Sequence, residues 1–297
     1  MAQGVDFIAL SFVRSAKEIG ELRDLIVRAE SLRVVSQETP IRIVAKIEKR
    51  EAVDCMDEII AAVDVIMVAR GDLGIEMAPE RVPIVQKQLV AKCRLAAKPV
   101  IVATQMLDSM IRNPRPTRAE VSDVANAVVD HADAVMLSGE TAGGAHPFEA
   151  VEMMARIIRE TENSTLDHLD VEHRRGDARS VEEAVSEIAN VLVRDVDVRL
   201  IVVASAQGDL GRTVSRFRPE MPIVVATDDP RVRRQLSVSW GVLPILLKRA
   251  ENAEVFFREA AVSVKALGLA GAGDRVVVIG GDPVGPLSDR VEIRELP

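Results

Sequence analysis

The sequence predicts an α/β protein in two parts, on two observations. Short apolar, β-branched runs alternate with longer amphipathic stretches along residues 6–160, and a polar segment then leads to a second alternating region. Such alternation is typical of repeated βα units on a parallel sheet. Because polar residues follow each expected strand, we expect a partial (β/α)8 TIM-type barrel of about five βα units, followed by a smaller three-layer α/β domain.

The elements of the first part are expected from their hydrophobic periods. Strands are expected at 7–12, 41–46, 64–69, 99–103 and 133–137. Helices are expected at 15–34, 49–61, 81–97, 118–130 and 147–162, with Ser15 and Thr117 at N-cap positions. Five units do not close an eight-stranded barrel, so we expect unpaired outer strands or completion by another chain.

The second part begins after a linker. Residues 163–179 are polar and charged without periodicity, which favours domain boundaries at 1–162, 163–179 and 180–297. Strands are then expected at 199–204, 222–226, 243–248, 275–279 and 290–295. Helices are expected at 180–194, 212–218, 230–238 and 251–267.

Composition narrows the class of function. A net charge of -8 and an aromatic content of 2% argue against a nucleic-acid partner, because clustered cations and stacking platforms are missing. No apolar run has the length of a membrane span and the first residues lack signal-peptide features, so we expect a cytoplasmic protein without a membrane partner. Cys55 and Cys93 lack metal spacing and are expected to be reduced.

Lys46 and Glu48 form the sharpest candidate pair. Both follow the apolar run of an expected strand, and alternation places them on the same side at its end. A lysine there can neutralise charge on a transferring phosphoryl group or an enolate, and a glutamate can hold a divalent cation. A structural ion pair at the rim of the barrel is the alternative.

The next expected strand ends in Ala69, Arg70, Gly71 and Asp72. Glycine allows the backbone to approach a ligand closely, and exposed N–H groups there would suit a carboxylate or a phosphate. Asp72 occupies the same strand-end layer as Glu48, so the two carboxylates could converge on Mg²⁺. A turn that requires glycine and aspartate for its geometry is the alternative.

Two later strand ends add polar candidates. Thr104 could relay a proton, although a threonine after a strand is often a cap or a turn residue. Glu140 and Arg118 could pair with each other or meet substrate. The four histidines, at positions 131, 146, 168 and 173, show no metal-ligand spacing and are expected in loops or on the surface.

Six short segments, in this order, resemble one known family. They are Ser11-Phe12-Val13-Arg14, Ala45-Lys46-Ile47-Glu48, Ala69-Arg70-Gly71-Asp72-Leu73-Gly74, Ala103-Thr104-Gln105-Met106-Leu107, Pro116-Thr117-Arg118-Ala119-Glu120 and Ser138-Gly139-Glu140-Thr141-Ala142. Together they resemble pyruvate kinase, strongly to about residue 162 and more loosely through the second domain.

The resemblance implies phosphoryl transfer between phosphoenolpyruvate and ADP, giving pyruvate and ATP, with Mg²⁺ or Mn²⁺ and K⁺ as cofactors. Lys46 would stabilise the transferring phosphoryl group and the enolate, and Glu48 and Asp72 would ligate the divalent ion. The backbone at 69–72 would hold the substrate carboxylate. Thr104 would lie near the face of enolpyruvate that is protonated, and phosphoryl transfer of this kind relies on positioning and electrostatics.

The resemblance also marks departures. The family's first three barrel strands, its lid domain and its K⁺ ligands would precede the first residue of this chain, so we expect K⁺ dependence without K⁺ ligands here. Activity is expected to require a chain that supplies those strands, and family tetramers make a homo-oligomer an expectation. Two other functions stay open: a non-catalytic regulatory or binding module that pairs with full-length subunits, and a metal-dependent lyase or aldolase acting on pyruvate.

The second domain carries the family's effector region in altered form. Its loop after the first strand spans 205–213, and Asp209 and Leu210 stand where a phosphate would require a cation and a hydroxyl. We therefore expect no sugar bisphosphate effector. The late loop at 280–286 keeps glycine and proline without evident phosphate ligands.

Overall fold

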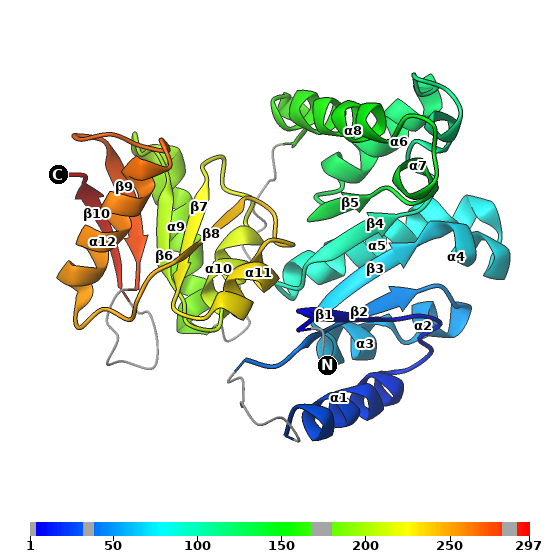
Figure 1. The fold of residues 1–297 in the computed structure, drawn as a ribbon, viewed down its shortest axis with the longest axis horizontal. Helices are drawn as coiled ribbons and strands as arrows, with labels where there is room; N and C mark the ends of the chain where they lie inside the picture. Colours follow the sequence, from blue (N-terminus) through cyan, green and yellow to red (C-terminus); the bar gives the residue numbers. More distant parts are fainter. Residues whose placement is uncertain (1–3, 32–38, 168–179, 281–289) are drawn as a thin grey trace. The chain divides into compact units, whose positions relative to one another are not determined.

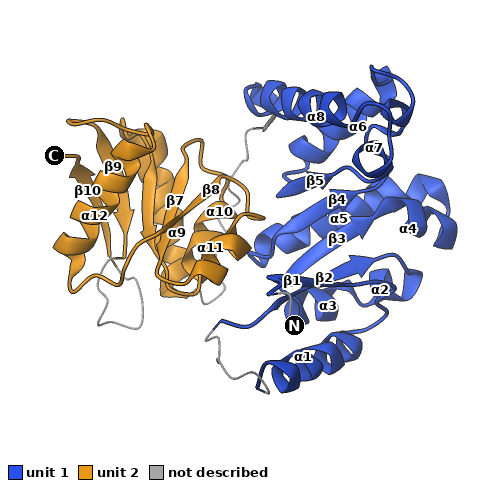
Figure 2. Ribbon diagram, viewed as in Figure 1, with its two compact units in different colours: residues 1–168 blue, residues 169–297 orange. Residues whose placement is uncertain are grey.

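The computed structural model describes residues 4–31, 39–167, 180–280 and 290–297. The chain divides into two compact units, residues 1–168 and residues 169–297 (Figure 2). Each has its own sheet and its own core, so each is described by itself. Most of the expected linker, His168, His173 and the late loop from 281 to 286 lie outside the described residues.

Unit 1 is built on a parallel sheet of five strands in the order β1-β2-β3-β4-β5 (Figure 1). The strands are β1 (Phe7–Leu10), β2 (Arg42–Ile47), β3 (Val65–Ala69), β4 (Val100–Ala103) and β5 (Ala134–Met136). The helices are α1 (Ala16–Ser31), α2 (Arg50–Asp54), α3 (Met56–Ala62), α4 (Arg70–Glu76), α5 (Val82–Leu95), α6 (Arg118–Val129), α7 (Gly139–Ala142) and α8 (Pro147–Glu162), with 3-10 turns η1 (Pro79–Arg81), η2 (Asp108–Ile111) and η3 (Thr165–Asp167). The five predicted βα units are confirmed, and β1 and β5 are the outer strands of the described sheet.

Unit 1 departs from the sequence prediction at several places, including the short helix α7, which was not predicted. The helix expected at 49–61 is two helices, because Cys55 interrupts it with φ -121° and ψ 31°. A helix that was not predicted, α4, begins at Arg70 directly after β3. The first strand ends at Leu10, since Phe12 has a φ of 56° and leaves the extended region.

The core of unit 1 joins the sheet to the helices that follow its strands. Every residue of β3, the central strand of the parallel sheet, is buried. Side chains from α1, α3, α5, α6 and α8 complete one apolar cluster with the strands. The Thr117 N-cap is confirmed: its hydroxyl accepts from the Glu120 N–H at 3.2 Å, and the Glu120 carboxylate accepts from the Thr117 N–H at 2.7 Å.

Asp64 ties the amino ends of two strands together. Its carboxylate accepts a hydrogen bond from the Ile43 N–H at 2.9 Å and pairs with Arg23 at 3.1 Å and with Arg42 at 3.0 Å. Burial opposes ionisation of this group, but the Ile43 N–H and the two guanidinium charges outweigh it and hold the pKa of Asp64 below its ordinary value. A charge cluster therefore fixes the end of the sheet at which β2 and β3 begin. The candidate site lies at the opposite end, where the strands finish.

Unit 2 is a three-layer α/β domain, as predicted. Its strands are β6 (Ile201–Ala204), β7 (Ile223–Thr227), β8 (Val242–Leu246), β9 (Arg275–Ile279) and β10 (Val291–Glu295), in the order β10-β9-β6-β7-β8. Its helices are α9 (Val181–Asp195), α10 (Asp209–Ser215), α11 (Pro230–Leu236) and α12 (Ala253–Ala266). Only β10 is antiparallel to its neighbour in this sheet.

Alternating strand residues of unit 2 face two separate apolar clusters. Val203 and Val225 pack with α9, α10 and α11, whereas Val202 and Val224 pack with α12. This alternation is what a sheet covered by helices on both faces requires. No helix in the described ranges combines the length and the hydropathy of a membrane span.

Candidate active site

The predicted site residues lie at the carboxyl ends of three neighbouring strands. Lys46 pairs with Met67 across β2 and β3, and Ala69 pairs with Ala103 across β3 and β4. The strands are parallel, so the residues that follow Ala69 and Ala103 emerge at the same edge of the sheet. The fold therefore brings the predicted segments together at one edge, where a barrel of this type builds its site.

Lys46 and Glu48 lie together at the end of β2 and form an ion pair, the contact that the structural alternative described, with 2.5 Å between Nζ and Oε1. The Glu48 side chain is 1% exposed and that of Lys46 is 26% exposed. Lys46 Nζ also donates to Ser11 Oγ at 2.9 Å. A buried carboxylate thus holds a partly exposed ammonium group at the rim, where a ligand can reach it.

Sequence reasoning gave no role to the residue that holds the second oxygen of Glu48. The Phe12 N–H donates to Glu48 Oε2 at 2.6 Å from a left-handed backbone, and the Phe12 side chain is 54% exposed. The Lys49 ammonium lies 5.7 Å from the centre of the Phe12 ring. Because the contact is made by a main-chain group, no side-chain pattern in the sequence could have identified it.

Gly71 and Thr104 meet across the ends of β3 and β4. The Gly71 N–H donates to Thr104 Oγ1 at 2.8 Å, and Thr104 Oγ1 donates to the Ala103 carbonyl at 2.6 Å. A Cβ atom on Gly71 would lie 3.4 Å from Thr104 Oγ1. Thr104 (φ 72°) and Gln105 (φ 53°) both occupy the left-handed region.

The side chain of Arg70 is committed to protein contacts. Its guanidinium bonds Asp123 at 2.7 Å, the Thr104 carbonyl at 2.8 Å and Met106 Sδ at 2.8 Å, and it is 13% exposed. Only the backbone of Arg70 is left for a substrate, which agrees with the backbone role that the resemblance implies.

Asp72 lies in the first turn of α4 and is half-buried. Together with Glu48 it supplies two carboxylates at the ends of neighbouring strands. No group of three or more His, Cys, Asp or Glu residues with metal-site geometry occurs in the described part of the chain. Mg²⁺ is commonly held by one or two carboxylates with water and substrate oxygens, so this donor set fits a divalent ion shared with a phosphorylated substrate.

Glu140, a further candidate, has structural partners. Glu140 is 2% exposed and accepts from the Leu107 N–H at 3.1 Å and the Ser138 N–H at 2.8 Å, instead of pairing with Arg118. These bonds link the loop after β5 to the loop after β4.

The cysteines and two of the histidines match their sequence predictions. Cys55 and Cys93 are free thiols, and burial raises the pKa of Cys93 well above its usual range. His131 and His146 lie in loops.

In unit 2 the altered effector loop is closed on itself. Arg212 donates to the Gln207 carbonyl at 3.0 Å and pairs with Asp209, and its side chain is 10% exposed. The cation nearest to this loop is therefore already neutralised by a residue of the same loop.

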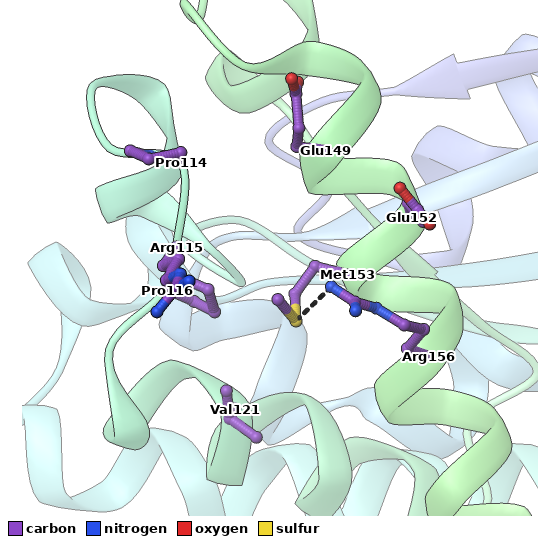
Figure 3. A pocket seen from close by; sticks show the side chains of 8 residues that line it. All are labelled: Pro114, Arg115, Pro116, Val121, Glu149, Glu152, Met153 and Arg156. Carbon is purple, nitrogen blue, oxygen red and sulfur yellow. Dashed lines mark hydrogen bonds between the residues drawn. The ribbon is translucent and has the colours of Figure 1, made fainter.

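A cavity of about 480 Å³ lies between the loop before α6 and helix α8 (Figure 3). It is lined by Pro114, Arg115, Pro116, Val121, Glu149, Glu152, Met153 and Arg156. Its mixed charges include the guanidinium of Arg156, 3.7 Å from Met153 Sδ. None of the predicted site residues lines it.

Two family models match the chain. The model for the pyruvate kinase barrel domain matches residues 1–151, and that for the pyruvate kinase alpha/beta domain matches residues 183–289. A pyruvate kinase from Sporosarcina psychrophila is 43% identical over 95% of this chain and 47% of its own length. One from Geobacillus stearothermophilus is 44% identical over the same shares.

Solved structures agree with these matches. A crystal structure of a pyruvate kinase from Cryptosporidium parvum superposes with a TM-score of 0.90 at 38% identity, covering 99% of this chain and 59% of that one. The chain spans about half the length of these two curated relatives. On both family models and on these relatives, the chain belongs to the pyruvate kinase family.

Proposed function

We propose that the protein transfers a phosphoryl group between phosphoenolpyruvate and ADP, giving pyruvate and ATP. The observation that carries the proposal is the Lys46–Glu48 ion pair at the carboxyl end of β2, on the same sheet edge as the Gly71–Thr104 contact. Membership of the pyruvate kinase family gives this arrangement its substrates. The second domain, unit 2, is proposed to be the family's C-terminal domain, joined by the linker at 163–179.

Lys46 supplies a positive charge at the point of transfer. Its ammonium group is fixed by Glu48 and Ser11 and keeps about a quarter of its side chain exposed. In phosphoryl transfer the transition state carries negative charge on the phosphoryl oxygens, and the product enolate carries it on oxygen. A fixed cation stabilises both without reorganising.

Glu48 and Asp72 are the residues proposed to hold Mg²⁺ or Mn²⁺. When bound, a divalent ion of this kind neutralises phosphate charge and orients phosphate oxygens. Glu48 meets this role with one oxygen bonded to Lys46 and the other to the Phe12 N–H, which fixes the direction of the carboxylate. The family's K⁺ requirement is carried over, with no residue of this chain assigned to it.

The junction of β3 and α4 is proposed to hold the carboxylate of the substrate. The N–H groups of residues 69–72 lie there, and the first turn of a helix leaves such groups without partners inside the helix. The Gly71 N–H already donates to Thr104 Oγ1, so the other N–H groups of this junction are the ones proposed to bind the carboxylate. Thr104 lies against this junction through its bond from Gly71. Its hydroxyl is proposed to hold the proton that the enolpyruvate carbon receives.

Lys46→Ala tests the proposal against a matched control. The full chain is assayed with phosphoenolpyruvate, ADP, Mg²⁺ and K⁺, following pyruvate formation, and folding is checked by circular dichroism. Lys49 is the control because it is 29% exposed and forms an ion pair of 2.5 Å with Glu76, much as Lys46 does with Glu48.

Removal of a preorganised charge commonly lowers kcat by about 10²–10³, which is the loss expected for Lys46→Ala. Lys49→Ala should stay within about threefold of the unmodified chain. Equal losses in both variants would contradict the proposal. No transfer by a folded unmodified chain would mean that this chain needs a partner that supplies further βα units, or that it has a binding role instead of a catalytic one.

Association is proposed to occur at the outer strands of unit 1. Each of β1 and β5 pairs on one side only within the described sheet, and such edges can accept a further strand. A second copy, or a chain that supplies further βα units, would pair with these outer strands. The cytoplasm is the proposed location of the protein. Light scattering after size exclusion measures the mass; a monodisperse monomer that performs the transfer would exclude the need for a partner.

A further inference from the structure

The turn after β4 has a backbone that its sequence does not favour. Thr104 and Gln105 follow each other with φ values of 72° and 53°. A left-handed backbone is unusual for residues other than glycine, and for a β-branched residue it is an outlier. Such a turn persists only when surrounding groups hold it.

Arg70 is one of the groups that hold the turn. Its Nη2 atom donates to the Thr104 carbonyl at 2.8 Å. The same guanidinium grips Asp123 of α6 with both terminal nitrogens, each 2.7 Å from a carboxylate oxygen. A planar guanidinium held by two parallel bonds has a fixed orientation, so the direction of the third bond is fixed as well.

The residue next to Arg70 holds the other polar group of Thr104. The Gly71 N–H bonds Thr104 Oγ1 at 2.8 Å, so the carbonyl and the hydroxyl of one threonine are both fixed from the start of α4. We propose that Arg70 is a positioning residue for Thr104, with Asp123 as its anchor. This inference rests on the proposed function, in which Thr104 holds the proton that the enolpyruvate carbon receives.

A third helix supports the same guanidinium. Gln86 of α5 accepts from Arg70 Nη1 at 3.4 Å and donates at 3.0 Å to Asp130, the C-cap residue of α6. Gln86 is 2% exposed, so this support is shielded from water. Arg70 acts on the reaction only through Thr104: its side chain fixes where the hydroxyl lies and makes no contact with substrate.

The structural test uses Arg70→Lys and Asp123→Asn in the full chain, with Arg42→Lys as the control. Arg42 pairs with Asp64 at 3.0 Å and is 18% exposed, against 13% for Arg70, so the control removes a comparable arginine–aspartate pair at the other edge of the sheet. Hydrogen exchange and backbone NMR shifts report Gly71 and Thr104 directly.

In Arg70→Lys and Asp123→Asn, exchange of the Gly71 N–H should accelerate by about tenfold or more, because its acceptor loses its fixed place. The carbon shifts of Thr104 should move toward those of an ordinary backbone. Both should stay unchanged in Arg42→Lys. Unchanged Gly71 exchange in Arg70→Lys, or an equal acceleration in the control, would overturn the positioning role.

The chemical test measures exchange of the C3 protons of pyruvate with deuterated solvent, which is the protonation step run in both directions. With Mn²⁺ present, Arg70→Lys should lower the maximal exchange rate by about tenfold and leave the pyruvate KM within about twofold. Mn²⁺ affinity, followed by electron paramagnetic resonance, should not change. A loss of Mn²⁺ affinity equal to the loss of rate would show a merely structural effect.

The two tests fail differently. If the unmodified chain exchanges no C3 protons, the chain by itself does not perform the proposed reaction, and the Gly71 and Thr104 measurements still decide whether Arg70 positions the turn. If the unmodified chain exchanges them and Arg70→Lys is equally fast, the positioning role fails and the proposed function stands.

Discussion

Replacing Asp64 with asparagine should destabilise unit 1 by about 2 kcal/mol. Asp64 is 11% exposed and accepts from the Ile43 N–H at 2.9 Å, a bond to a charged acceptor that commonly contributes about 1.5–3 kcal/mol. Its pairs with Arg23 and Arg42 are partly exposed, so each adds less than about 1 kcal/mol. Asparagine keeps one acceptor oxygen, so part of the stabilisation by the hydrogen bond from the Ile43 N–H is retained.

The two units can be followed separately because of the chain's aromatic content. Trp240 is the only tryptophan, tyrosine is absent, and Trp240 belongs to unit 2. Tryptophan fluorescence during urea unfolding therefore reports unit 2, and far-ultraviolet circular dichroism reports the helices of both units. Asp64→Asn should move the dichroism transition of unit 1 to lower urea and leave the fluorescence transition in place.

Asp54→Asn is the control for this measurement. Asp54 forms an exposed pair with Arg50 at 3.9 Å, with both side chains 69% exposed, so its replacement should change stability by no more than about 0.5 kcal/mol. Equal shifts for the two variants, or a shift of the fluorescence transition alone, would refute the assignment of Asp64 as the link between β2 and β3.

The stability difference between the unmodified chain and Asp64→Asn should depend on pH, and the direction of this dependence follows from the pKa of Asp64. The folded-state pKa of Asp64 is lowered, so its contribution is fully present above the unfolded-state pKa of about 3.9 and is lost as the pH falls through the folded value. The stability gap between the unmodified chain and Asp64→Asn should be constant from about pH 5 to 7 and should shrink below about pH 4. A gap that widens on acidification would refute the reasoning.

Three further predictions concern other elements. Gly211→Ala should destabilise unit 2 by about 2 kcal/mol, measured by the fluorescence transition, because its Cβ would lie 2.6 Å from a methyl group of Val225; an unchanged midpoint would contradict this packing. Thr117→Ala should cost about 1 kcal/mol in unit 1 by circular dichroism, since the capping box with Glu120 is lost, and Thr117→Ser should restore most of it. A sugar bisphosphate should give no heat on titration, because Asp209 already neutralises the cation of its loop, and saturable binding would contradict this.

The fold was predictable where a local period decides the structure. The five strands of unit 1 and the first four of unit 2 coincide with short apolar runs in the sequence, whereas β10 alternates apolar and charged residues. The period could not locate α4, since residues 70–76 contain two glycines and begin immediately after a strand. It also missed the interruption at Cys55, where each flanking segment is helical by itself.

The site was predictable as a set of side chains but not as a set of contacts. Lys46 and Glu48 could be paired from their spacing, because alternation along a strand fixes which side chains share a face. The bond from Phe12 to Glu48 could not, since every residue has the same N–H group and only the turn after β1 aims this one. The same holds for the carbonyl of Thr104, which Arg70 reaches across 34 positions in the sequence.

These main-chain contacts bear on how a variant of the site should be interpreted. Two of the strained backbones in unit 1 lie at the candidate site: Phe12, which holds Glu48, and Thr104, which Arg70 holds. A strained residue costs about 1–3 kcal/mol and is kept in place by its neighbours, so substitutions of these neighbours release strain as well as remove a bond. Arg70→Lys should therefore lower the free energy of unfolding by less than its number of lost hydrogen bonds suggests. Thr104, in contrast, should lose its fixed position completely. An effect on reaction rate that exceeds the effect on stability is the signature that separates positioning from structural support, and it can be measured on one set of variants.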